Sequence, residues 1–129
     1  MMERLRALAG SGFVHVAFAF IAMGGWAVFA NRAHAMPAPL FAGFVQGSIS
    51  AVLTLCLKST IDTLSGRMTG FTALWLPPLV ACLGSTAILV IMHTISGTPE
   101  ILQTILVPLI VSTTYATTYS YSLYRTRTR

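Results

Sequence analysis

Four long stretches without a charged side chain occupy most of this chain. They are residues 7–31, 33–57, 68–99 and 101–124. Each exceeds the roughly 20 residues that an α-helix needs to cross the hydrocarbon of a bilayer. Only 9% of the residues are charged, whereas about 25% are charged in soluble domains. The sequence therefore predicts an all-α fold, an integral membrane bundle of four transmembrane helices with short loops.

We expect one four-span membrane domain over residues 1–129, with helices at approximately 8–30, 40–64, 77–95 and 99–123. A β-barrel is excluded because the apolar runs are continuous and do not alternate with polar residues. Pro77 and Pro78 leave two interpretations of the third helix. Either it begins there, because proline fits the first turn, or a longer helix is kinked, with the carbonyls of Ala73 and Leu74 unpaired. We favour the first.

The connections also carry signals. Thr98 is expected to cap the fourth helix, with Pro99 at its first position. Just after the first run, Ala33 and Ala35 form an A-x-A sequence that resembles a signal-peptide cleavage site. The apolar stretch before it, residues 13–30, exceeds the usual length of about 7–15 residues. We therefore favour a retained first helix.

Lysine and arginine are distributed unevenly along the chain. Of the eight, only Arg32 lies in the first connection, whereas seven lie near the amino terminus, in the second connection and in the carboxyl tail. The positive-inside rule then predicts a multi-pass protein of a bacterial-type inner (plasma) membrane, with both termini cytoplasmic. Because such a bias allows one orientation only, self-association would be parallel.

Small residues mark two faces where another helix can approach closely. Gly10, Ala17 and Gly24 recur at seven-residue spacing in the first helix, and Gly43 and Gly47 form a GxxxG sequence in the second. Small residues at these spacings allow helix backbones to come into contact in membranes. We assign these five residues to helix packing.

Polar side chains follow one face of the second helix and gather in the last half of the fourth. The candidates for lining a solute path are Gln46, Ser50, Thr54, Lys58, Asp62, Tyr115 and Tyr119. Lys58 and Asp62 are one turn apart and can pair, framing a cytoplasmic mouth. The alternative for Gln46, which we favour, is an interhelical hydrogen bond. For the fourth helix, the alternative is that the hydroxyls bond carbonyls of their own helix.

Several functional classes find no support in the residues. His15 and His93 differ in depth by roughly 20 Å along their helices, so they cannot share one haem. No metal-ligand spacing is present, so we expect neither metal nor cofactor. Cys56 and Cys82 lie within apolar runs as packing residues. No nucleophile–base motif indicates an enzyme, and the basic residues flank helices and do not form a nucleic-acid surface.

The remaining expectation is a small polytopic membrane protein in contact with the lipid bilayer. Passive or weakly coupled transport of a neutral or amphiphilic solute, in a parallel homo-oligomer, is the first hypothesis. Strong coupling is disfavoured because no ionisable residue lies at mid-membrane. The alternative is a non-catalytic accessory or assembly subunit that docks on a membrane partner protein.

Overall fold

The computed structural model describes residues 1–4 and 12–128 of the chain. Its long helices are α2 (Gly12–Ala30), α3 (Ala38–Arg67), α4 (Thr72–Ser96) and α5 (Ile101–Arg127). All four are long and apolar enough to cross a membrane. The described part contains no strand. The predicted all-α bundle of four membrane-spanning helices is therefore confirmed.

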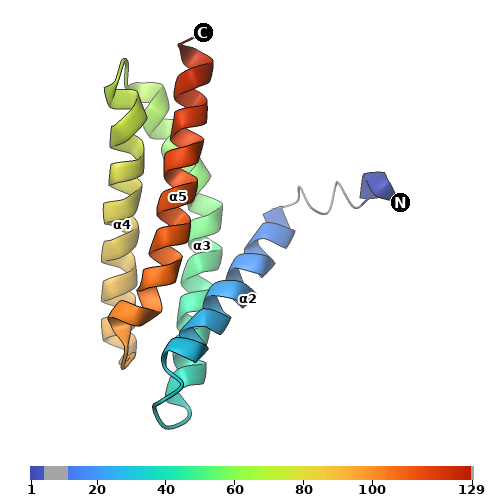
Figure 1. The fold of residues 1–129 in the computed structure, drawn as a ribbon, viewed down its shortest axis with the longest axis vertical. Helices are drawn as coiled ribbons and strands as arrows, with labels where there is room; N and C mark the ends of the chain where they lie inside the picture. The colour runs from blue at the N-terminus through green and yellow to red at the C-terminus, as the bar shows by residue number, and fades with distance from the viewer. Residues whose placement is uncertain (5–11, 129) are drawn as a thin grey trace.

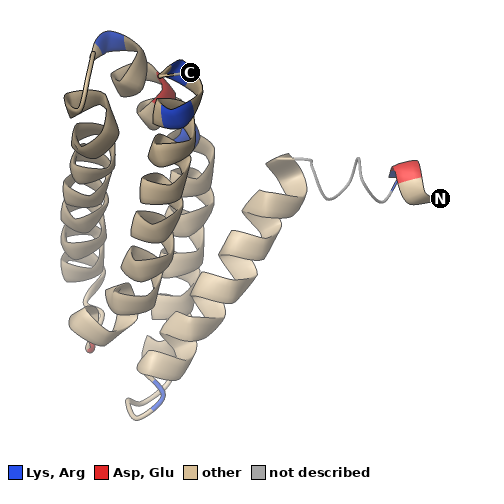
Figure 2. Cartoon of the chain, turned by 45° about the horizontal axis from the view of Figure 1, so that its top comes forward, with Lys and Arg blue, Asp and Glu red and all other residues tan. Residues whose placement is uncertain are grey.

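The helices are arranged with α3 and α5 in the middle (Figure 1). Helix α4 contacts both of them, and α2 contacts both from another side. The amino-terminal part of α2 inclines away from the other three helices (Figure 1). Lysine and arginine gather where α3 and α5 end (Figure 2). We call this the basic end, and we call the opposite end, which holds the 97–100 turn, the Glu100 end.

The core lies between α3, α4 and α5 in two apolar clusters. Ile49, Leu89 and Ile105 form the cluster toward the Glu100 end. Leu57, Ile61, Ala81 and Ala116 form the cluster toward the basic end. Each cluster joins all three helices, so the three pack as one unit to which α2 is added.

Glycines set the contact between α2 and α3. A Cβ atom added to Gly24 would lie 2.9 Å from the carbonyl oxygen of Gly43. One added to Gly47 would lie 2.9 Å from the carbonyl oxygen of Phe20. Only glycine lets the two backbones approach this closely. Three of the five predicted packing residues, Gly24, Gly43 and Gly47, therefore lie in this contact, while Ala17 is half-buried and Gly10 lies outside the described residues.

Helix α4 begins at Thr72, not at Pro77. Pro77 and Pro78 are buried inside it, which corrects the favoured interpretation. The two prolines cannot donate to the carbonyls of Ala73 and Leu74. Ser120 of α5 supplies the missing donor: its Oγ lies 2.8 Å from the Leu74 oxygen and 3.4 Å from the Ala73 oxygen. A hydroxyl from a neighbouring helix thus donates to the carbonyls that the prolines leave unpaired.

The turn between α4 and α5 differs from the prediction as well. Helix α5 begins at Ile101, and no side chain caps it, so the expected Thr98 cap is wrong. Gly97 ends α4 with a φ of 74° and donates its N–H to Thr94. Thr98 donates its N–H to the His93 carbonyl. This is the Schellman arrangement, which needs a residue with positive φ, and it turns the Thr98 hydroxyl to the His93 ring.

Candidate functional site

The second predicted helix contributes a buried chain of hydrogen bonds. The Gln46 amide nitrogen donates to Ser50 Oγ at 2.8 Å, and its oxygen lies 2.8 Å from His93 Nε2. The other ring nitrogen of His93 lies 2.7 Å from Thr98 Oγ1. Gln46 and His93 are both fully buried. This chain, Ser50–Gln46–His93–Thr98, joins α3, α4 and the turn after α4, and we call it the buried polar chain.

Its bonds have a defined direction. The Gln46 carbonyl oxygen can only accept, so Nε2 of His93 carries the proton. The Nδ1 atom of a neutral imidazole then accepts from the Thr98 hydroxyl. Both ring nitrogens of His93 and both ends of the Gln46 amide are thereby paired. Gln46 and Ser50, two of the candidates for a solute path, thus lie in the buried polar chain, and Gln46 makes the interhelical hydrogen bond to His93.

His93 lies in the interior of the bundle. It is 0% exposed, although it lies in the last turn of α4. A buried imidazole requires hydrogen-bond partners, and Gln46, 47 residues earlier, provides one. Gln46 lies near the start of α3 and His93 near the end of α4. Because these helices are antiparallel, the two side chains lie at the same depth, and this was the signal in the sequence for their pairing.

The other candidates of α3 lie toward the basic end. Thr54 donates its hydroxyl to the Ser50 carbonyl at 2.8 Å. Lys58 Nζ lies 3.0 Å from one oxygen of Asp62, and the Tyr119 hydroxyl donates to the other oxygen. The Tyr115 ring stacks on that of Tyr119, with centroids 5.8 Å apart. The structure therefore brings Lys58, Asp62, Tyr115 and Tyr119 together, separately from the buried polar chain.

The hydroxyls of α5 divide into two groups. Elsewhere in the bundle, Thr60, Thr86 and Thr94 each donate to the carbonyl four residues earlier. In α5, the exposed Thr126 does the same, but within the part of the chain that the structure describes three exposed threonines of this helix make no side-chain hydrogen bond. They are Thr114, Thr117 and Thr118. We call these three residues the open hydroxyl stripe.

A groove of about 620 Å³ lies between α4 and α5 beside this stripe. Its polar lining comes from α5 and its apolar lining mostly from α4. The residues are Leu74, Trp75, Pro78, Leu79, Cys82, Thr113, Thr117, Thr118 and Tyr121. We call it the α4–α5 groove. Its volume falls within the 300–1,000 Å³ or so that small-molecule sites occupy.

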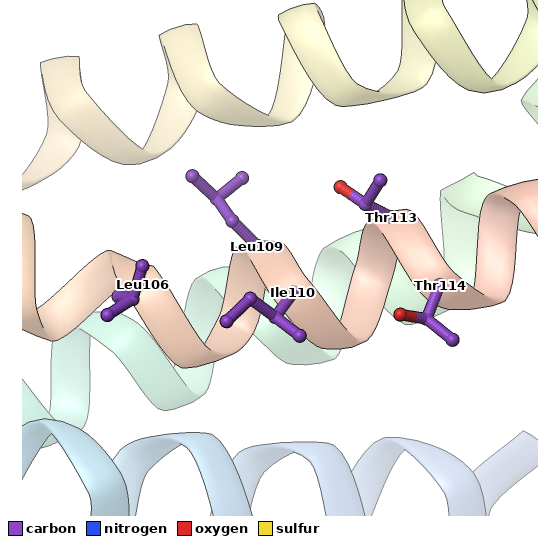
Figure 3. Close-up of a pocket in the computed structure, with 5 residues that line it drawn as sticks. All are labelled: Leu106, Leu109, Ile110, Thr113 and Thr114. Atoms are coloured by element: carbon purple, nitrogen blue, oxygen red, sulfur yellow. The ribbon is translucent and has the colours of Figure 1, made fainter.

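A smaller hollow of about 320 Å³ lies along α5 itself, lined by Leu106, Leu109, Ile110, Thr113 and Thr114. Figure 3 shows Leu109 and Thr113 pointing toward α4, whereas Thr114 lies on the side of α2. Thr113 lines both hollows and donates to Cys82 Sγ at 3.5 Å. The exposed face of α5 is thus hollowed over much of its length.

The Glu100 end contains a second polar cluster that sequence reasoning missed. The side-chain nitrogen of Asn31 lies 2.8 Å from Thr104 Oγ1, and its oxygen accepts from the Glu100 backbone N–H at 3.0 Å. The Glu100 carboxylate lies 3.0 Å from His34 Nε2. Asn31 and Thr104 are fully buried. These contacts attach the end of α2 to the start of α5.

Among residues 1–4 and 12–128, no three His, Cys, Asp or Glu side chains come close enough to hold a metal ion. Cys56 and Cys82 are free thiols. Comparison of the chain with family models, curated proteins and solved structures found no match. The case for a function therefore depends on the buried polar chain, the open hydroxyl stripe and the α4–α5 groove.

Proposed function

We propose that this protein allows a neutral or amphiphilic solute to pass along the exposed side of α4 and α5, within a parallel homo-oligomer. The observation that carries the proposal is the open hydroxyl stripe. Thr114 lies halfway along α5, at the depth where a membrane-spanning helix is surrounded by hydrocarbon. A solute, water or a second copy would give these hydroxyls the partners that lipid tails lack.

Unpaired polar groups in hydrocarbon are costly. An unpaired hydroxyl in an apolar environment costs about 1–3 kcal/mol by protein mutational data. A threonine can avoid that cost by bonding its own helix, as Thr86 and Thr94 of α4 do. Thr114, Thr117 and Thr118 do not take this route. This contrast favours a hydrated or solute-bound face over a lipid-covered one.

The charge distribution supports a passive or weakly coupled mechanism. Lys58 and Asp62 lie in the last third of α3 and pair with each other. Such a pair can frame the mouth of a path at the basic end, next to Tyr115 and Tyr119. Coupling to protons or cations generally uses an ionisable group deep in the membrane, and the open hydroxyl stripe contains none.

The orientation is part of the same proposal. Seven of the eight basic residues lie on one side of the predicted membrane, which favours a bacterial-type inner membrane with both termini in the cytoplasm. The basic end would then face the cytoplasm. Copies inserted in a single orientation associate in parallel, so the α4–α5 sides of neighbouring copies would surround a shared axis along the membrane normal.

The test is solute flux into liposomes that contain the purified protein. We would measure glycerol entry by light scattering and the transbilayer movement of a fluorescent amphiphile. The triple variant Thr114→Val, Thr117→Val and Thr118→Val removes three hydroxyls at nearly constant shape, and its flux should fall at least tenfold. The matched control, Thr86→Val with Thr94→Val, removes two hydroxyls that bond their own helix and should keep the wild-type flux. Equal flux in both variants would refute the proposal.

A second function is favoured by a different observation. The exposed apolar side chains of α2 include Phe13, Phe18 and Ile21, with exposures of 80%, 71% and 72%. This helix also inclines away from the bundle (Figure 1). Such a face suits a non-catalytic accessory subunit whose α2 docks on a membrane partner protein. Co-purification with another protein at fixed stoichiometry, without flux by the isolated chain, would favour this function over transport.

A further inference from the structure

The α4–α5 groove ends at an arginine. Tyr121 lines the groove, and its hydroxyl accepts a hydrogen bond of 3.2 Å from Arg125 Nη1. The guanidinium carbon lies 5.9 Å from the centroid of the Tyr121 ring. Arg125 is exposed. A cationic group with several unused donors therefore lies at the end of the groove nearest the basic end.

This positive charge has no carboxylate partner within the described residues. The ion pairs there are His34–Glu100 and Lys58–Asp62. Glu100 lies at the opposite end of α5, and both oxygens of Asp62 are engaged, by Lys58 and by Tyr119. The Arg125 guanidinium thus remains available to an anion from outside the chain.

Below the guanidinium, the groove has a polar side and an apolar side. Thr117 and Thr118 lie one turn from Tyr121 on the α5 side, and Leu74, Trp75 and Leu79 lie on the α4 side. Tryptophan and tyrosine are typical of the level of lipid head groups. A cation therefore lies over a groove that has hydroxyls on its α5 side and hydrocarbon on its α4 side. These surfaces match the phosphate, the ester oxygens and an acyl chain of a phospholipid.

We propose that the α4–α5 groove binds an anionic phospholipid, with its phosphate at Arg125 and an acyl chain against Leu74 and Leu79. Basic pockets between membrane helices at the cytoplasmic side bind anionic head groups. Arginine also matches phosphate through two parallel hydrogen bonds. An anionic phospholipid would then be the amphiphile that passes along α4 and α5, and this identification rests on the proposed function.

The experiment measures lipid binding and not flux. The purified full chain is titrated with phosphatidylglycerol and with phosphatidylcholine of the same acyl chains, and bound lipid is counted by native mass spectrometry. The wild type should prefer phosphatidylglycerol by at least fivefold. Arg125→Gln should reduce that preference about fivefold, as expected for one basic side chain near an anionic surface.

Arg127→Gln is the matched control. It removes the same charge from the same helix end, but two residues on an α-helix are about 200° apart, so Arg127 lies on another face. This variant should retain the preference. A second variant, Leu79→Trp, fills the groove without changing charge and should reduce binding of both lipids, with circular dichroism verifying that it folds.

Three outcomes would overturn the inference. They are equal binding of the two lipids to the wild type, equal losses in Arg125→Gln and Arg127→Gln, and full binding to folded Leu79→Trp. The last would place lipid elsewhere and leave the groove to a second copy. Lipid preference without flux contradicts the proposed transport alone, whereas flux without lipid preference contradicts this inference alone.

Discussion

The polar groups on the two sides of α4 differ in whether they have hydrogen-bond partners. Toward α3, the buried polar chain pairs both ring nitrogens of His93 and both ends of the Gln46 amide. Toward the exposed face of α5, Thr117 and Thr118 line a groove, and the described chain offers them no hydrogen bond. The first side is complete in a single chain. On the second side, the hydroxyls need a partner from outside the chain. For that reason we assign a structural role to the α3 side and a functional role to the α5 side.

The largest expected effect tests the close packing of α2 against α3, the helix that carries Gln46 of the buried polar chain. Gly43→Val would place a Cβ against the Val28 side chain and 3.0 Å from the Gly24 carbonyl oxygen. Overpacking of this kind costs about 3 kcal/mol at the upper end of the usual range, measured as the free energy of unfolding in mixed micelles. Gly25→Ala is the control, because a Cβ there meets no atom within 4 Å. Similar losses in both variants would show that α2 and α3 do not meet as described.

The next effect tests whether the buried polar chain acts as a unit. Gln46→Leu leaves the His93 Nε2–H without its acceptor, and an unpaired buried donor costs about 2 kcal/mol of unfolding free energy. The double variant Gln46→Leu with His93→Leu removes both partners, so its loss should be smaller than the sum of the two single losses. Strict additivity in this double-mutant cycle would mean that the two side chains do not interact.

A smaller effect distinguishes the two kinds of hydroxyl on α5 itself. Ser120→Ala removes the donor to the carbonyls of Ala73 and Leu74 and should cost about 1 kcal/mol. If Pro77 and Pro78 are first replaced by alanine, their N–H groups can pair with these carbonyls. The same Ser120 substitution should then cost less. An equal cost in both backgrounds would rule out the role we assign to Ser120.

The smallest effect is expected for the open hydroxyl stripe. The Thr114, Thr117 and Thr118 valine variant loses no hydrogen bond of the described chain, so its unfolding free energy should change by less than about 0.5 kcal/mol. The same variant is predicted to lose flux. A destabilisation as large as that of Ser120→Ala would remove the distinction between the two sides of α4, because it would show that these hydroxyls support the fold.

The sequence predicted the spans and their order well, because the absence of charge over 20 or more residues constrains a chain strongly. It also predicted close packing at Gly43 and Gly47 and an interhelical bond for Gln46, since a buried amide requires a partner. The sequence did not predict which residue that partner is. His93 and Gln46 are 47 residues apart, and their meeting depends on the rotation of α3 and α4 about their axes.

The start of α4 shows the same limit. Pro77 and Pro78 are typical of a helix beginning, and nothing local to them indicates a donor for the carbonyls that they leave unpaired. That donor, Ser120, lies 46 residues after Leu74. Similarly, Asn31 gave no local sign of its contacts with Thr104 and Glu100. Local rules predicted elements and faces, whereas the pairing of polar groups required the assembled bundle.

The most direct test of the account is the water accessibility of Thr114. In a background where Cys56 and Cys82 are replaced by alanine, Thr114→Cys is treated in sealed vesicles with a membrane-impermeant thiol reagent. The control is Leu83→Cys, which is 62% exposed in the native structure and lies near the middle of α4. We predict that the thiol at position 114 reacts and that the one at 83 does not. No reaction at 114, or equal reaction at both positions, would contradict a hydrated α5 face.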